Sequence, residues 1–248
     1  MKEGDMYSTN SSGKVVVRKY LNCESVEIEF LNTGWKTVAR KQNIELGSVK
    51  DKYKPDVFGV GVVGCKYATK VNGKHLPEYI LWRNMITRCF DTESLSKRPT
   101  YEECTLSENF KSYEYFYEWC QNKIGFKEQG FALDKDILVK GNKVYSEDTC
   151  VFIPAEINTV LNKKAASRGK LPIGVSYHKA TGKFRAYVSQ GKGLPIKHLG
   201  LFENKLEAFS AYKQAKEDYL KELADKWKDQ IHPRVYQALN RYQVEITD

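Results

Sequence analysis

The strongest constraint on the fold is a helical pattern in residues 205–227. Apolar side chains recur there every three or four positions and would form one face: Leu206, Phe209, Tyr212, Ala215, Tyr219, Leu220, Leu223 and Trp227. A helix with a single apolar face must cover another layer of structure. A hairpin within 171–190 and a third strand at 196–202 precede it, so residues 169–230 are predicted to pack three strands on one helix.

The charges around this hairpin are unevenly placed. Between Lys163 and Gly200 there is no Asp or Glu, but there are nine cations: Lys163, Lys164, Arg168, Lys170, Lys179, Lys183, Arg185, Lys192 and Lys197. Strand alternation would aim Lys183 and Arg185 to one face, with Phe184 and Ala186 turned toward the helix. The clustering of these cations is a stronger indication of an anionic partner than the net charge of +9.

Residues 1–75 are predicted to form a small β domain. In 25–30, Val26, Ile28 and Phe30 alternate with polar residues, which is typical of a half-buried strand. The run GVGVVG at 59–64 lacks the strand–helix setting and the lysine of a phosphate loop, and it is interpreted as a close-packed turn or strand.

Residues 76–162 have a mixed pattern. One helix is predicted from Pro77, and a second over 107–124 with Ser107 as its cap. A short hairpin around Gly141 and Asn142 and a helix after Pro154 follow. The segment 231–248 is a C-terminal tail, either a short helix or an extended chain, and the whole is predicted to be a multidomain α+β protein.

Other features narrow the class of protein. No apolar run approaches the roughly 18 residues that a membrane-spanning helix needs, and the first residues lack the apolar stretch of a signal peptide. The six cysteines show no metal-site spacing and are interpreted as reduced, buried side chains. A cytoplasmic location is therefore expected.

The C-terminal segment resembles the APETALA/ethylene-response-factor DNA-binding domain. The matching pieces, in order, are Gly174-Val175, Gly182 to Ala186, Leu199 to Phe202, Glu207-Ala208 and Ala211-Tyr212. The resemblance implies three antiparallel strands lying in the DNA major groove, with the helix supporting the sheet from behind. Plant members carry more arginines where this chain has Ser176, Lys179 and Ser189, so their site preference is not carried over.

A set of residues on and around these strands is expected to contact double-stranded DNA. Arg185 is expected to read guanine, because arginine makes bidentate contacts to that base, while lysines bind phosphates. The full set is Lys170, Tyr177, His178, Lys179, Lys183, Arg185, Tyr187, Gln190, Lys192 and Lys197.

The middle segment resembles phage-borne relatives of HNH homing endonucleases. The matching residues fall in two helices and a ββα region: Trp82, Met85, Arg88 and Cys89; Phe110, Tyr113 or Phe116, and Trp119; Asp134, Tyr145, Cys150, Asn158 and Asn162. The resemblance implies a nuclease centre that holds one divalent metal ion.

This centre lacks the histidine that would act as general base, because the expected position reads Asp134-Lys135-Asp136. The nearest histidines, His75 and His178, belong to other segments. Weak catalytic candidates are Asp134, Asp136 and Asn158, and weak Mg²⁺ ligands are Asp134, Asn158 and Asn162. The centre is therefore interpreted as degenerate, with Asp134 and Asn158 as turn and cap residues.

Three functions follow as hypotheses. The first is a phage-type double-stranded-DNA-binding protein that reads the major groove with its C-terminal sheet. The second is an active Mg²⁺-dependent endonuclease of the homing type. The third is a phage product that binds a host protein through residues 1–75, in the cytoplasm of the host cell.

Overall fold

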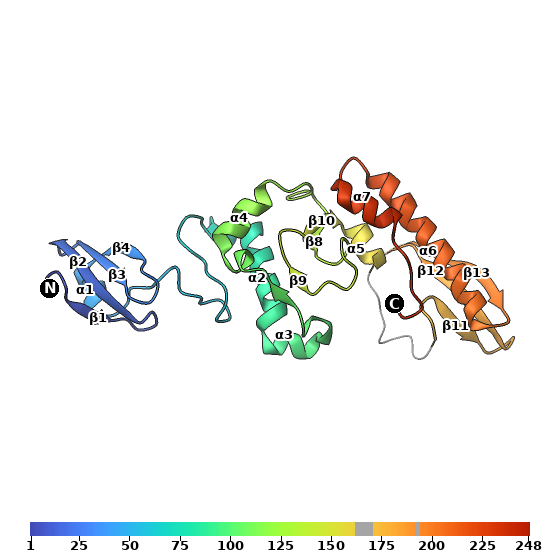
Figure 1. Ribbon diagram of the computed structural model, residues 1–248, viewed down its shortest axis with the longest axis horizontal. Helices are drawn as coiled ribbons and strands as arrows, with labels where there is room; N and C mark the ends of the chain where they lie inside the picture. Colours follow the sequence, from blue (N-terminus) through green and yellow to red (C-terminus); the bar gives the residue numbers. More distant parts are fainter. Residues whose placement is uncertain (162–170, 192–193) are drawn as a thin grey trace. The chain divides into compact units, whose positions relative to one another are not determined.

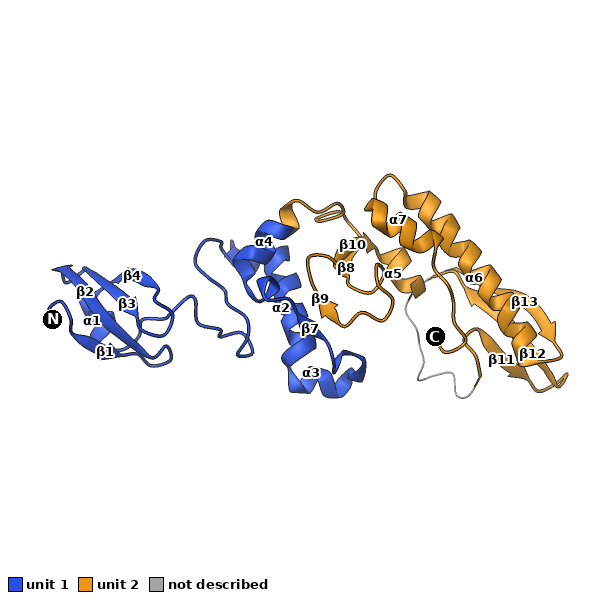
Figure 2. Ribbon diagram, viewed as in Figure 1, with its two compact units in different colours: residues 1–119 blue, residues 120–248 orange. Residues whose placement is uncertain are grey.

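The computed structural model describes residues 1–161, 171–191 and 194–248 (Figure 1). The described residues form two compact units, Met1–Trp119 and Cys120–Asp248 (Figure 2). The protein is α+β, as predicted. It has a four-stranded antiparallel sheet near its N-terminus, a helical middle region and a three-stranded antiparallel sheet that packs on one long helix.

The N-terminal sheet has the strand order β1-β2-β3-β4. Its elements are β1 (Met6–Ser8), β2 (Lys14–Asn22), β3 (Ser25–Phe30), β4 (Lys36–Ala39) and the short helix α1 (Lys41–Glu45). The predicted alternation in β3 is confirmed, since Val26, Ile28 and Phe30 are fully buried. Ile44 of α1 joins the same core.

Aromatic side chains form the core of the middle region. Its elements are β5 (Lys70–Val71), β6 (Lys74–His75), α2 (Pro77–Phe90), α3 (Thr92–Lys97), η1 (Pro99–Tyr101), β7 (Thr105–Leu106), η2 (Asn109–Lys111) and α4 (Tyr113–Gln121). Trp82 of α2 is fully buried, and its Nε1 donates a hydrogen bond to the carbonyl of Phe110 at 2.9 Å. Gly61 lies so close to Trp82 that a Cβ would collide with the indole ring, as expected for a close-packed segment.

The second predicted helix of this region begins later than expected. Ser107 was predicted as its cap, but α4 starts at Tyr113. Ser107 Oγ instead accepts a hydrogen bond from the Phe110 amide in the short 3₁₀ turn η2. Ser112 then has an extended backbone, with φ −89° and ψ 122°, and its hydroxyl accepts a hydrogen bond from the Tyr115 amide. A serine hydroxyl can accept a hydrogen bond from the amide three residues later in a 3₁₀ turn as well as at the start of an α-helix. The sequence pattern alone therefore does not distinguish these two structures.

The second unit begins with a ββα arrangement. Its elements are β8 (Phe131–Asp134), β9 (Val144–Tyr145), β10 (Val151–Pro154) and α5 (Ala155–Leu161), and β8 pairs antiparallel with β10. The hairpin expected around Gly141 and Asn142 is therefore a longer connection between β8 and β10. Asn142 stabilises this connection, because its Nδ2 donates hydrogen bonds to the carbonyls of Lys135 and Val144.

The C-terminal sheet has the order β11-β12-β13. Its elements are β11 (Val175–His178), β12 (Lys183–Ser189), β13 (Ile196–Phe202) and, after them, the helices α6 (Lys205–Trp227) and α7 (Pro233–Asn240). The helix predicted at 205–227 is confirmed, and Asn204 caps it by accepting hydrogen bonds from the amides of Leu206 and Glu207. The final stretch combines both alternatives, a short helix followed by an irregular chain.

Helix α6 contributes to two separate cores. Its first half buries Ala208 and Tyr212 against the sheet. Its second half joins β10, α5, α7 and two residues outside these elements, Ile137 and Ile231, in a larger cluster. The buried residues of this cluster are Ile137, Val151, Ile153, Ile157, Val160, Tyr219, Leu220, Leu223, Ala224, Ile231, Val235 and Leu239. Segments that the sequence analysis treated separately, including 231–248, thus pack within one unit.

The start of β11 lies directly against α6. Gly174 has φ +74°, and a Cβ there would overlap the ring of Tyr212. Only glycine combines this backbone conformation with such a close approach. Among the described residues, no helix is long and apolar enough to cross a membrane.

Candidate nucleic-acid interface

The C-terminal sheet has one face covered by α6 and one face turned away from it. Val175, Ala186 and Val188 are buried in the clusters that α6 forms with the sheet. Alternation and strand register place a different set of side chains on the opposite side, which we call the open face: Ser176, His178, Lys183, Arg185, Tyr187, Ser189, Ile196, His198 and Leu201. All of them are exposed or half-exposed.

Arg185 lies at the centre of the open face. It pairs with Ser176 on β11 and with Leu201 on β13. Its Nε donates a hydrogen bond to Ser176 Oγ at 3.2 Å, and its guanidinium carbon lies 5.7 Å from the centre of the Tyr187 ring. These contacts hold the side chain across the sheet, so less conformational entropy is lost when the guanidinium binds a ligand.

Lys183 lies on the open face as predicted, but it has an acidic partner. Its Nζ is 2.6 Å from Glu203 Oε1. Phe202 pairs with Phe184, so Glu203 follows next to the start of β12. The sequence analysis missed this contact because Glu203 lies just beyond the acid-free stretch. Part of the positive charge of Lys183 is therefore neutralised within the protein.

Three further predicted residues lie on the open face or at its edge. His178 pairs with Lys183, and its Nδ1 is 2.8 Å from Thr181 Oγ1 in the turn that follows. Lys179 is exposed in the same turn. Tyr187 lies beside Arg185 on β12. The open face therefore has a cationic end at the β11–β12 turn, with His178, Lys179 and Lys183, and a centre formed by Arg185 and Tyr187.

Other predicted residues lie away from the open face. Tyr177 pairs with Phe184, and their rings pack edge to face with centroids 5.6 Å apart, on the side that α6 covers. Gln190 follows β12, and its carbonyl accepts a hydrogen bond from Tyr219 of α6. Lys170, Lys192 and Asn162 lie outside the described residues, as do the linker cations Lys163, Lys164 and Arg168.

A β-bulge in β13 explains the position of Lys197. The register shifts between Ala186 and Tyr187, so that Gly200 pairs with Ala186 but His198 pairs with Tyr187, leaving Leu199 unpaired. Lys197 consequently pairs with Val188 and is exposed on the α6 side, while His198 and Ile196 join the open face. Simple alternation along β13 would have reversed these assignments, and the sequence analysis named Lys197 as a cation of the acid-free stretch but did not name His198.

The nuclease-like segment holds its acidic residues in local contacts. Asp134 Oδ1 accepts hydrogen bonds from the amides of Asp136 and Ile137, at 2.8 and 2.7 Å. Burial raises the pKa of the Asp134 carboxyl, and these two hydrogen bonds oppose that rise. Asp136 pairs with Lys135 at 2.6 Å. Asp134 thus stabilises the turn after β8, as expected for a turn residue.

The described residues do not fit the Mg²⁺ centre that the resemblance allows. An oxygen of Asp134 is occupied by backbone amides, and Asp136 is neutralised by a lysine. Asn158 is half-buried on α5. Across the described part of the chain, no group of three or more His, Cys, Asp or Glu side chains is placed to hold a metal ion.

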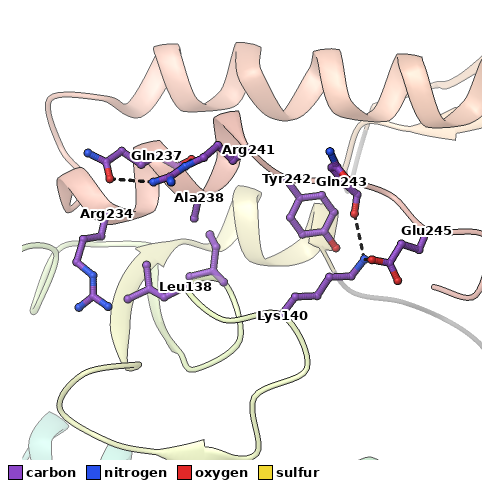
Figure 3. A pocket seen from close by; sticks show the side chains of 10 residues that line it. Leu138, Lys140, Arg234, Gln237, Ala238, Arg241, Tyr242, Gln243 and Glu245 are labelled. Atoms are coloured by element: carbon purple, nitrogen blue, oxygen red, sulfur yellow. Dashed lines mark hydrogen bonds and ion pairs between the residues drawn. The ribbon is translucent and has the colours of Figure 1, made fainter.

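A groove beside α7 is a second candidate site (Figure 3). It has a volume of about 450 Å³ and is lined by α7, the chain after it and the 137–140 segment. Two of its cations already have partners within the protein. Lys140 contacts Asp248 at 2.8 Å and the Gln243 carbonyl at 3.0 Å, and Arg241 donates to the Gln237 side chain at 3.1 Å. The charge of Lys140 is therefore neutralised within the protein, whereas Arg241 contacts a neutral amide and keeps its charge.

Comparison with known proteins identifies no relative. No protein-family model, no curated protein and no solved structure matches this chain. The functional assignment therefore depends on the geometry of the sheet and on the chemistry of the side chains that it presents.

Proposed function

We propose that this protein binds double-stranded DNA and reads the major groove with the open face of the β11–β12–β13 sheet. One observation carries the proposal. The three strands contain no Asp or Glu, and their open face presents Arg185 at its centre, while α6 covers the other face. A face of this kind is complementary to a polyanion.

The dimensions of the sheet are compatible with the groove. Neighbouring strands lie about 4.8 Å apart, so the three strands span roughly 10 Å between the outer strand axes. The major groove of B-DNA is about 12 Å wide and admits a β-ribbon. Other DNA-binding proteins insert strands in this way. The resemblance of this segment to the ethylene-response-factor domain supports the same docking mode.

Different side chains would have different roles in the complex. Arg185 would donate two hydrogen bonds to O6 and N7 of guanine. Lys179 and Lys183, at the end of the sheet, would bind phosphates and position the protein without reading sequence. The proposal concerns binding alone, because the acidic residues after β8 are engaged in the turn and with Lys135.

The test compares Arg185→Ala with Lys197→Ala. A preferred duplex is first selected from random sequences, and dissociation constants are then measured by fluorescence anisotropy on that duplex and on random DNA. Arg185→Ala should weaken binding to the preferred duplex roughly 10- to 100-fold and change binding to random DNA much less, because it removes a base contact. Lys197, on the α6 side, should have a small and equal effect on both.

Thermal unfolding of both variants controls for damage to the sheet. Equal losses on the two duplexes after Arg185→Ala would contradict base reading by this residue. A wild-type protein that does not bind duplex DNA at physiological salt would refute the proposed function itself.

A further inference from the structure

Two apolar side chains on the open face have no role in phosphate binding or guanine recognition. Leu201 is 45% exposed and Ile196 is 56% exposed, both on β13. They point away from the core that α6 forms, so burial within the described structure does not account for them. Leu201 pairs with Arg185, so it is placed to meet an apolar group of whatever ligand Arg185 binds.

The position of Leu201 relates it to Arg185. The two residues pair directly across β12 and β13. Paired side chains in an antiparallel sheet have Cβ atoms about 4.5–5.5 Å apart, and successive base pairs are about 3.4 Å apart along the duplex. When Arg185 contacts a guanine, Leu201 would therefore meet the same or a neighbouring base pair.

Major-groove chemistry limits what Leu201 can recognise there. Base edges in this groove present hydrogen-bond donors and acceptors, and the one apolar group is the C5-methyl of thymine. Leucine has no hydrogen-bonding group, so a methyl contact is the favourable interaction that it can make.

A protein partner is less compatible with this surface. Leu201 and Ile196 are separated along β13 by His198, and they alternate across the face with Arg185 and Ser189. Apolar residues scattered in this way do not make the contiguous patch that marks a protein interface.

We propose, building on the DNA-binding function, that Leu201 determines specificity by contacting a thymine methyl group next to the guanine bound by Arg185. Ile196, which pairs with Ser189 at the other end of the sheet, makes a second contact of the same kind further along the groove. The preferred ligand is then a duplex with thymine within about one base pair of that guanine.

The experiment removes one methyl group from the DNA. In the selected duplex, the thymine beside the guanine is replaced by deoxyuridine, which keeps every hydrogen-bonding group and lacks the C5-methyl. Wild-type affinity should fall about fourfold, the effect expected for one buried methyl. Leu201→Ala should bind the two duplexes equally, whereas Leu201→Met should keep the preference for thymine.

Leu206→Ala is the matched control. Leu206 is 58% exposed at the start of α6, on the other side of the sheet, so this variant should discriminate thymine from deoxyuridine as the wild type does.

The outcomes separate the two proposals. Equal wild-type affinity for the two duplexes would overturn the methyl contact while leaving DNA binding intact. A Leu201→Ala variant that still prefers thymine would also overturn the methyl contact by Leu201, because another side chain would then recognise the methyl group. A protein that binds neither duplex would overturn both proposals together.

Discussion

Lys216 is a charged residue buried in α6 between the two cores that this helix serves. It is only 9% exposed, and its Nζ donates a hydrogen bond to the carbonyl of Val160 at the end of α5, at 2.6 Å. Burial lowers the pKa of the Lys216 ammonium from 10.5 to about 8. Removal from water thus costs stability whenever this side chain is charged.

The cost of burying Lys216 should depend on pH. Below about pH 8 the ammonium is charged in both the folded and the unfolded chain, so the full penalty applies. Between pH 8 and 10.5 the unfolded chain binds more protons, and stability therefore rises with pH. We predict that the stability of the wild type relative to Lys216→Met increases by about 2–3 kcal/mol over this range.

Urea unfolding of both proteins from pH 7 to 10.5 measures this difference. Lys205→Met, at an exposed position of the same helix, is the control and should show a pH-independent difference from the wild type. A constant difference for Lys216→Met would show that its amine does not titrate in this range.

At the scale of elements, α7 is an integral part of the second unit. Val235 and Leu239 of α7 are 0% and 1% exposed and pack in the cluster that includes α5 and the second half of α6. The neighbouring Gln237 faces outward. The helix therefore covers a core rather than forming an appended tail.

Substitution of Leu239 tests this packing. We predict that Leu239→Ala lowers the free energy of unfolding by about 2–5 kcal/mol, because it leaves a cavity in the cluster. Gln237→Ala, two positions away and exposed, should change it by less than about 0.5 kcal/mol. Similar small effects of both substitutions in urea unfolding would mean that α7 is dispensable for the core.

Local patterns predicted the elements better than they predicted their contacts. The helical period of 205–227 and the alternation of β3 are properties of neighbouring residues, and both were confirmed. The bulge at Leu199 has no comparable signal, because an unpaired residue shows itself only once the partner strand is in place. The ion pair of Lys183 with Glu203 and the packing of Leu239 also depend on residues brought together by the fold.

For the candidate interface, the sequence predicted the residues that β12 contributes to the open face but not those that β13 contributes. Lys183 and Arg185 were predicted from alternation within the uninterrupted strand β12, and Tyr187, named as a further candidate, lies on the same face. His198, Ile196 and Leu201 belong to the bulged strand, where the same rule fails for part of its length.

At the scale of the whole molecule, the net charge of +9 is unequally available for binding. In the N-terminal sheet, Arg18 contacts Glu29 at 2.9 Å and Arg40 contacts Glu24 at 2.8 Å. In the C-terminal sheet, β11, β12 and β13 contain no acidic residue, although Lys183 meets an acidic partner, Glu203, just beyond β13. A cation in the C-terminal sheet should therefore contribute more to the proposed DNA binding than a cation in the N-terminal sheet.

Salt dependence measures this inequality. We predict that Lys179→Gln combined with Lys183→Gln makes the slope of log K against log [KCl] shallower by up to about 1.8, since each phosphate contact contributes about 0.9. The charge-matched variant Arg18→Gln with Arg40→Gln should leave the slope unchanged. If both pairs reduced the slope equally, the N-terminal sheet would also contact DNA.

The bulge at Leu199 has a consequence for how this surface can change during evolution. Deleting Leu199 would restore regular pairing and leave His198 opposite Tyr187 on the open face and Lys197 on the α6 side. A single codon could therefore be lost at this point without changing which side chains the open face presents, and Arg185 on the neighbouring strand would stay in place.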